Sequence, residues 1–258
     1  MKNIKLRKTT TELNAIRGPK GLIAYNTDDG SIRIYDGDIL GGWSFLGDPI
    51  EFPIPGPSEL IAGNETTGFY GEVASTELFT RSDLLAAVGI SSGSLMTTED
   101  TWLKFALDGK TLFVHKTGVI SSASRSGLLQ LNLVYPTESV TLTLSGLTYR
   151  VRLLNGIDQN PTSVTRGQDN PTETAGSEWN RLIYPIHESD IDGAGWGINY
   201  TNSDIQVGLQ NKTGTLIQES HIDYPSAQRG YSSVGWFGAS ILDDDPNNIW
   251  RPVLEVVQ

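Results

Sequence analysis

The chain has 258 residues, of which 38% are hydrophobic, and it carries 30 Asp and Glu against 19 Lys and Arg, a net charge of -11. An acidic chain is a poor partner for a phosphate backbone, so we expect no nucleic-acid partner. It has no cysteine, which excludes disulfides, thiolate zinc sites and thiol catalysis. No apolar stretch approaches the roughly 18 residues that span a bilayer, so we expect no membrane insertion.

The first 20 residues are polar and basic, with six basic residues and one acidic residue, a balance of +5. No apolar core of a secretory signal is present among them. A segment of this kind is either a disordered tail or a basic arm that docks onto a partner. Residues 155–258 hold fourteen acidic and five basic residues, a balance of -9, so the two ends are expected to have different roles.

A β-hairpin is predicted directly after the basic segment. The apolar run 21–25 and the alternating run 31–35 are separated by the turn residues Asn26-Thr-Asp-Asp-Gly30, a pattern typical of two antiparallel strands. An isolated hairpin is marginal in water, so it needs either another copy of itself or a docking protein. We therefore assign residues 1–47 to an anchor, with these candidate docking side chains: Leu22, Ile23, Tyr25, Ile32, Ile34 and Tyr35.

Prolines mark the next segment. Pro53, Pro55 and Pro57 fall within five residues, which favours extended polyproline geometry over a central strand. Residues 48–68 are therefore predicted to be a linker. Residues 69–100 are predicted to be a short helical connector.

The helix of this connector is expected from Thr80 to Val88. Thr80 or Ser82 can cap its start, and Gly89 can end it. Apolar residues recur along it at helical spacing. It is short, which suits a packing element better than a recognition helix.

Strands dominate from residue 101 onward. Asp108-Gly109 separates two apolar runs and predicts one hairpin, and Ser145-Gly146 predicts another. The run Val253–Val257 predicts a buried final strand. We therefore predict a mainly β fold with one short helix, made of an N-terminal hairpin anchor and a loop-rich C-terminal domain over residues 101–258.

No pattern in the sequence points to catalysis. The three histidines, His115, His187 and His221, are not spaced to share one helix face. Gly89-Ile-Ser91-Ser-Gly93 matches the spacing of a nucleophile elbow, but the predicted helix precedes the serine instead of following it, so a loop is the better interpretation. We predict no catalytic residue, no cofactor and no enzyme activity.

Acidic residues leave two further interpretations open. Asp243-Asp244-Asp245, beside Asn247-Asn248, offers oxygen ligands for Ca²⁺ but lacks the spacing of an EF-hand loop, so a solvated acidic turn is favoured. A glycosidase needs two carboxylates close together in space, and the sequence does not give distances.

Single aromatic residues alternate with Gly, Ser, Asn and Asp over residues 187–250, the composition of adaptable binding loops. Ring faces of this kind stack on sugars or fill protein pockets. The candidate host- or partner-binding residues are Tyr224, Arg229, Tyr231, Trp236 and Phe237. We expect the four aromatic members of this set to be exposed, and Trp179, Trp196 and Trp250 to lie in the core.

Two stretches resemble a known class of proteins. Residues 18–37, followed by Gly41-Gly-Trp43, resemble the N-terminal hairpin of tailed-bacteriophage virion proteins. Residues 176–185, Arg229-Gly-Tyr231 and residues 250–254 are similar to the C-type-lectin-like domains at the ends of phage structural proteins. The calcium-binding tripeptide of true C-type lectins is absent, and Arg181 stands where their Trp-Asn-Asp has its acid.

This resemblance implies a virion structural protein, either a tail fibre or a head fibre or decoration, assembled in the host cytoplasm. It would dock through its N-terminus onto other virion proteins and onto itself as a trimer. Its lectin-like domain would bind a host cell-surface glycan or protein, or cover the particle. The alternatives are a surface-glycan depolymerase and a calcium-dependent lectin module.

Overall fold

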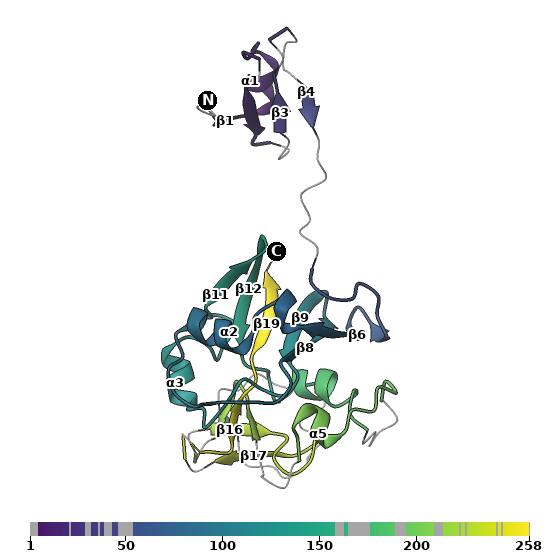
Figure 1. Cartoon of the computed structure of the whole chain (residues 1–258), viewed down its shortest axis with the longest axis vertical. Coiled ribbons are helices and arrows are strands. Elements are labelled where there is room, and N and C mark those ends of the chain that lie inside the picture. The colour runs from purple at the N-terminus through teal and green to yellow at the C-terminus, as the bar shows by residue number, and fades with distance from the viewer. Residues whose placement is uncertain are drawn as a thin grey trace. The chain divides into compact units, whose positions relative to one another are not determined.

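The chain divides into two compact units, Met1–Pro53 and Ile54–Gln258, in a computed structural model (Figure 1). The structure describes residues 5–20, 22–28, 32–35, 37–38, 43–45, 54–157, 163–164, 176–188, 195–208, 214–221, 223–224, 226–240, 242–243 and 245–257.

The smaller unit is a four-stranded sheet with a helical turn. The sheet runs in the order β1-β2-β3-β4, with β1 parallel to β2 and the other pairs antiparallel. Its elements are β1 (Lys5–Lys8), α1 (Thr10–Asn14), β2 (Ile23–Asn26), β3 (Ile32–Ile34) and β4 (Trp43–Phe45). The predicted hairpin is confirmed as β2–β3. The alternative that the basic segment is a disordered tail is wrong for its described part, which forms β1 and α1.

The start of α1 shows why this segment folds. The Thr9 hydroxyl accepts from the Glu12 amide at 3.4 Å, and the Glu12 carboxylate accepts from the Thr9 amide at 2.9 Å, which is a capping box. Leu13 then packs against Ala24 and Tyr35, and the Tyr35 hydroxyl donates to the Leu13 carbonyl at 3.0 Å. The helix therefore covers one face of the sheet.

The larger unit contains a seven-stranded sheet in the order β11-β12-β19-β9-β8-β6-β5. The predicted hairpins are confirmed as β8–β9 and β11–β12, and the predicted final strand is β19, hydrogen-bonded between β12 and β9. The strand bounds are β5 (Ala62–Asn64), β6 (Thr67–Ala74), β8 (Thr101–Leu107), β9 (Lys110–His115), β11 (Thr141–Leu144), β12 (Leu147–Arg152) and β19 (Val253–Val257).

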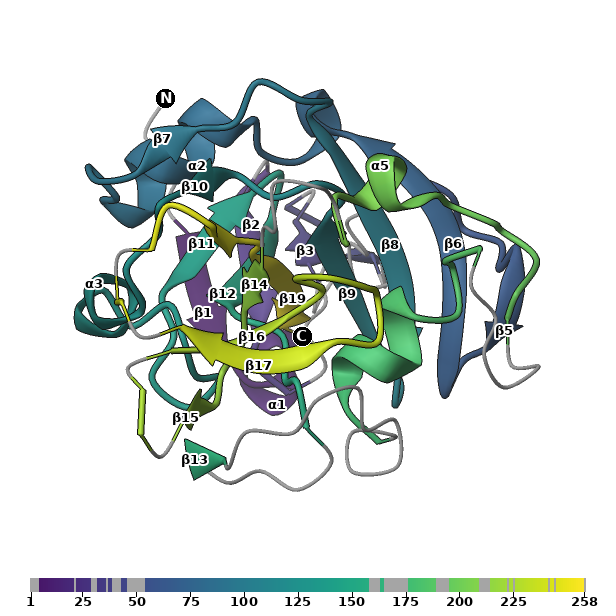
Figure 2. The same ribbon diagram turned by 90° about the horizontal axis from the view of Figure 1, so that it is seen from below.

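A six-stranded sheet in the order β17-β16-β14-β18-β10-β7 and a two-stranded pair, β13-β15, complete the strands described in this unit. Figure 2 brings β16 and β17 to the front. The bounds are β7 (Ser94–Leu95), β10 (Ile120–Ser121), β13 (Ser163–Val164), β14 (Gly214–Leu216), β15 (Ser220–His221), β16 (Ser226–Arg229), β17 (Phe237–Ser240) and β18 (Asn248–Trp250).

Short helices lie between these strands, so the mainly β prediction is confirmed. They are η1 (Ser75–Glu77), α2 (Arg81–Val88), α3 (Arg125–Gln130), the π-helical turn η2 (Trp179–Ile183) and α5 (Asn202–Ile205). The predicted helix is α2, capped by Thr80 and ended by Gly89 at φ +76°. No helix in the described part of the chain has the length and apolar character to cross a membrane.

The boundaries between segments differ from those predicted. Residues 54–68 were expected in a linker, but β5 lies here and pairs with β6 of the large sheet. The Lys104 ammonium also donates to the Pro57 carbonyl at 2.6 Å. The connector 69–100 likewise belongs to the larger unit, because β6 pairs with β8 along its whole length. Pairing between strands distant in sequence therefore overrides the local proline signal.

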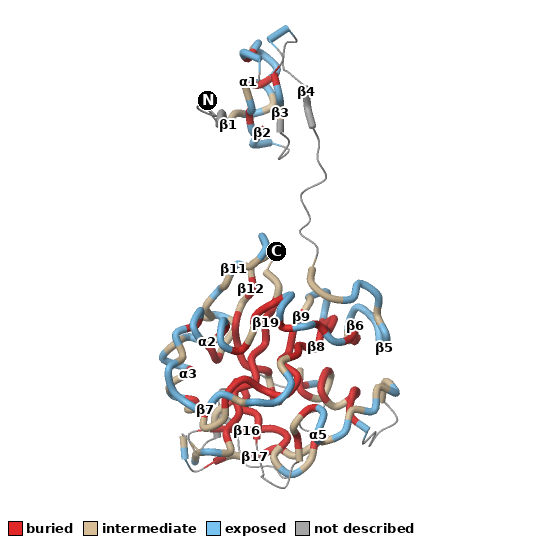
Figure 3. The backbone as a smooth tube through the Cα atoms, viewed as in Figure 1, coloured by how far each residue is buried: buried red, intermediate tan, exposed pale blue. Residues whose placement is uncertain are grey.

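The core of the larger unit lies along the inner strands, as the buried stretches of Figure 3 show. Trp179 and Trp250 are fully buried, as expected. Trp196 is only partly buried and packs at the edge of the cluster that contains Trp179.

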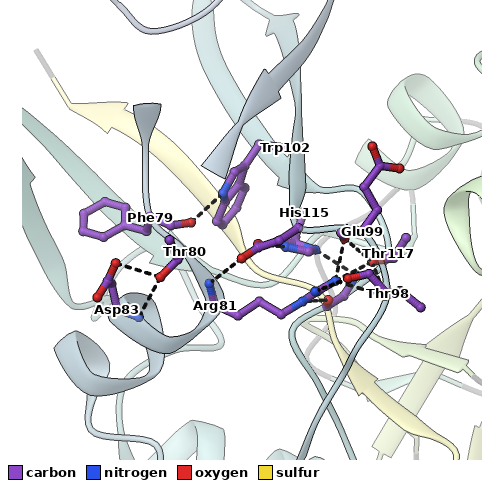
Figure 4. A network of polar contacts seen from close by, with 11 residues as sticks. Phe79, Thr80, Arg81, Asp83, Thr98, Glu99, Trp102, His115 and Thr117 are labelled. Carbon is purple, nitrogen blue, oxygen red and sulfur yellow. Dashed lines mark hydrogen bonds and ion pairs between the residues drawn. The ribbon is translucent and has the colours of Figure 1, made fainter. Parts of the chain in front are cut away.

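A buried polar network ties α2 to the sheet (Figure 4). The Arg81 guanidinium donates to the carbonyls of Thr98 at 2.5 Å and Gly118 at 3.1 Å. His115 Nδ1 accepts from the Gly118 amide at 3.0 Å, so Nε2 carries the proton and donates to Asp100 at 3.1 Å. Burial lowers the pKa of His115 to about 4. This histidine is therefore neutral and structural.

Candidate aromatic binding site

The candidate site is the loop Gly230–Trp236, which joins β16 to β17 and is called the aromatic loop below. The rings of Tyr231 and Trp236 lie with centroids 4.9 Å apart and planes at 36°. Both side chains are half-buried. The indole of Trp236 lies against Gly238, where an added Cβ would stand 2.2 Å from two of its ring atoms. The missing side chain of Gly238 thus makes room for the indole.

Tyr184 lies beside the aromatic loop. An added Cβ at Gly235 would stand 3.3 Å from its ring, and the tyrosine is half-buried at the end of η2. The sequence prediction missed Tyr184, because its only signal was an aromatic residue within an apolar island.

Arg229 holds the aromatic loop from beneath. Its guanidinium donates to the carbonyls of Trp236 at 3.2 Å and Gly235 at 3.3 Å. It also donates to the Gly156 carbonyl at 2.8 Å and the Asn180 side chain at 2.6 Å. Its exposed fraction is 0%. The prediction that Arg229 contacts a partner is therefore wrong, because the N–H groups of a buried arginine must form their hydrogen bonds within the protein.

Trp179 supports the same loop. Its indole nitrogen donates to the Val234 carbonyl at 2.8 Å, and the Arg229 guanidinium lies 5.8 Å from its ring centroid. The Gly230 amide also donates to the Trp236 carbonyl at 3.0 Å. The backbone of the aromatic loop is thus fixed before any ligand arrives, which lowers the ordering cost of binding.

The other predicted binding residues divide. Phe237 is buried in a small cluster with Ile157, Ile217 and Ala227, so the expectation that it is exposed is wrong. It follows Trp236 directly at the start of β17, and successive residues of a strand face opposite sides. Tyr224 is half-buried on the segment between β15 and β16. Tyr231 and Trp236 remain as the candidates that the structure brings together.

The side chains of the aromatic loop suit ligand binding. Residues 230–236 read Gly-Tyr-Ser-Ser-Val-Gly-Trp, so the loop itself contains no carboxylate, histidine or amine for proton transfer or metal binding. Aromatic rings beside serine hydroxyls suit a sugar face or an apolar side chain.

The acidic turn that the calcium interpretation used is engaged in hydrogen bonds. Asp243 accepts from Ser124 and Ser126, and Asp245 accepts from the Ser240 hydroxyl at 2.6 Å. Asp244 lies outside the described residues. Across the ranges that the structure describes, no three His, Asp or Glu side chains gather as metal ligands.

In the smaller unit, the candidate docking residues fall into two groups. Ile23 and Tyr25 are each 43% exposed and Ile34 is 38% exposed. Ile23 is the cross-strand partner of Ile34, and the Arg7 guanidinium lies 5.5 Å from the Tyr25 ring centroid. These three residues form the open face of the sheet, opposite α1.

The rest of the docking set does not share this face. Tyr35 is fully buried under α1, and Leu22 is half-buried against the same small core. The assignment of Tyr35 to docking is therefore wrong, whereas that of Leu22 stays a prediction. The side chain of Ile32 lies outside the described set, although its backbone pairs with Tyr25.

Comparison with known proteins adds little to this geometry. No protein-family model and no curated protein matches the chain. Two similar solved structures are the Major Tropism Determinant I1 variant, 10% identical with a TM-score of 0.23, and the U1 variant, 9% identical with a TM-score of 0.20. Each alignment covers 98% of this chain and 99% of that one.

Proposed function

We propose that this protein is a non-enzymatic structural appendage of a tailed-bacteriophage virion. The smaller unit would dock onto the particle and the larger unit would present the aromatic loop to a host-surface molecule. The observation that carries this proposal is the open apolar face of Ile23, Tyr25 and Ile34, on a unit separate from the main body. A soluble protein keeps such a face when another surface covers it.

Charge supports this division of roles. Residues 1–53 contain seven basic and seven acidic residues, so the smaller unit is neutral, and residues 54–258 contain twelve basic and twenty-three acidic residues, a balance of -11. The basic start is thus offset by acids within its own unit. A neutral unit with an apolar face suits close packing against protein, whereas a strongly charged unit resists packing against its own copies.

The placement of the aromatic loop suits display. In the larger unit, β16 and β17 lie at the end opposite to the one where the chain enters at Ile54 and where β19 finishes (Figure 1). The loop between them is pre-formed by Arg229 and Trp179. The larger unit would be the lectin-like end that the sequence resemblance implies, with host recognition at its far end.

The docking surface is tested with the exposed residues. Ile23→Asp and Ile34→Asp place charge on the open face without entering the small core. We expect the double variant to be absent from purified particles by mass spectrometry, and to lose the trimer that the resemblance implies. Arg17→Asp, at an exposed residue of the segment between α1 and β2, is the control. Normal incorporation of the double variant contradicts the proposal.

Host binding is tested separately with whole cells. Susceptible bacteria should retain the purified chain, and Trp236→Ala together with Tyr231→Ala should reduce retention at least tenfold. A purely structural head or tail component would show no retention. That result would remove host recognition while leaving docking in place.

A further inference from the structure

A second hollow, distinct from the aromatic loop, is lined by residues of β7 and of the loops beside β7 and β10. Figure 2 shows β7 and β10 on the side of the larger unit that carries α2 and α3. The volume of the hollow is about 560 Å³, within the range of small-molecule sites. It is lined by Ser92, Gly93, Ser94, Ser122, Ser124 and Asp243. The loop that resembled a nucleophile elbow thus forms one of its walls.

Three segments distant in the sequence meet here because β10 pairs with both β7 and β18. The first pairing places Ser94 opposite Ser121, and the second is continued by the Ala123 amide, which donates to the Asn248 carbonyl at 3.1 Å. The Asn248 side chain in turn donates to the Asp243 carbonyl at 3.0 Å. The lining is therefore held by regular sheet structure.

Several hydroxyl groups of the hollow remain available to a ligand. Ser92 and Ser94 are exposed, and their hydroxyls make no hydrogen bond to any residue that the structure describes. Ser122 is held at φ +55°, a left-handed conformation that a residue with a side chain rarely adopts. Ser124 is committed to Asp243, to which its hydroxyl donates at 2.5 Å.

Asp243 supplies the charge of the hollow. Partial burial acts to raise the pKa of this carboxyl, but hydrogen bonds from Ser124 and Ser126 outweigh it and lower the pKa. The carboxylate is thus ionised at neutral pH, and its Oδ1 accepts from the Ser126 amide at 3.1 Å. The Arg125 backbone also favours the charged form. Each carboxylate oxygen has two lone pairs, so Oδ1 can accept from one further donor, while anionic ligands are repelled.

The side chains of the lining match the hydroxyl edge of a pyranose. Serine hydroxyls can donate and accept hydrogen bonds, and the carboxylate accepts them. Leu95 and Leu242, the sequence neighbours of Ser94 and Asp243, are about half exposed, at 49% and 52%, but are not part of the lining.

We propose that this hollow is a subsite for an uncharged sugar residue, bound by Ser92, Ser94 and Asp243. The sugar donates a hydroxyl to the free position of the Asp243 carboxylate and exchanges hydrogen bonds with the two serines. This subsite does not depend on the proposed docking or on the aromatic loop.

A hollow elsewhere in this unit is lined by charged side chains that are already paired. It has a volume of about 300 Å³ and is lined by Arg152, Glu178 and Glu255, among others. Arg152 donates to Glu178 at 2.7 Å and to Glu255 at 2.9 Å. Because its charged groups are paired with one another, they are not available to a ligand.

The test is an NMR titration of the isotopically labelled full chain with methyl α-D-glucopyranoside, methyl β-D-galactopyranoside and N-acetylglucosamine. N-acetylneuraminic acid is the anionic comparator. At least one neutral sugar should shift the amides of residues 92–94 and 122–126 with saturable, millimolar affinity, and the anionic sugar should not.

Two variants locate the binding. Ser92→Ala with Ser94→Ala should weaken it at least tenfold and leave the fold intact, since both side chains are exposed. Trp236→Ala should leave it unchanged. The proposal is overturned if no neutral sugar binds at a sugar concentration of about 20 mM, which lies well above the millimolar dissociation constant expected. It is also overturned if the serine variant binds equally well. Equal binding of the anionic sugar, or shifts centred on the aromatic loop, also overturns it.

Discussion

Glu219 offers a sharp test of how the larger unit tolerates a buried charge. Its side chain is 1% exposed. One carboxylate oxygen accepts from the Gly156 amide at 2.9 Å, and the other has no partner among the described residues. Burial raises the pKa of Glu219 to about 7, and Glu178 adds to the rise, while the Gly156 amide and Arg125 oppose it.

The sign of the effect follows from linkage. The folded pKa of about 7 lies above the ordinary value of 4.5, so the folded state binds the proton more tightly. The stabilising contribution is fully present below pH 4.5 and is lost as the pH rises through 7. A difference of about 2.5 corresponds to about 3 kcal/mol, so above pH 7 the ionised carboxylate costs the fold about that much.

Glu219→Gln removes this cost. The amide oxygen can still accept from Gly156, while the new NH₂ group takes the position without a partner and costs about 1 kcal/mol. We therefore expect the variant to be about 2 kcal/mol more stable at pH 8 and no more stable at pH 4.5. Urea unfolding followed by tryptophan fluorescence measures both, with the exposed Glu138→Gln as control. A gain that is absent at pH 8, or equal at the two pH values, refutes the reasoning.

Three further outcomes follow from the same structure. Since burial lowers the pKa of His115 to about 4, below the unfolded value of 6.5, stability should fall by about 3 kcal/mol as the pH drops from 6.5 to 4. Urea unfolding should measure this loss in the Glu219→Gln variant, because protonation of Glu219 would otherwise raise the stability as the pH falls. Arg229→Met should cost about 3 kcal/mol in thermal unfolding, because three carbonyls lose their donor, and unchanged stability would contradict the role of Arg229. Gly238→Ala should displace the Trp236 indole and change its fluorescence, while Gly127→Ala, where an added Cβ meets Ser124 at an ordinary contact distance of 3.5 Å, should leave that fluorescence unchanged.

Local signals predicted the hairpins and α2 because their determinants lie within a few residues. Asp108 takes φ +50° and Gly109 φ +77°, as a tight two-residue turn requires. The boundary at 48–68 was wrong because the proline signal is local while the β5–β6–β8 pairing is not. The short α1 was missed although Thr9 and Glu12 carried a capping-box pattern.

The candidate site was predictable only in part. Tyr231 and Trp236 were expected to be exposed and are half-buried, with ring centroids 4.9 Å apart. Their role in binding stays a prediction. The burial of Arg229 depends on Gly156 and Trp179, which are distant in the sequence, and no local pattern gives it. The serine-lined hollow was missed for the same reason, since its walls are joined only when β10 pairs with β7 and β18.

The position of β19 between β12 and β9 sets the order in which the two units can be completed. Val253–Val257 is synthesised after every other strand of the seven-stranded sheet, and without it that sheet is split in two. The smaller unit uses only pairings among its own first residues and can fold while the ribosome is still translating the remainder. A prematurely terminated copy would therefore have a folded smaller unit and an incompletely folded larger unit, which proteases could degrade before assembly.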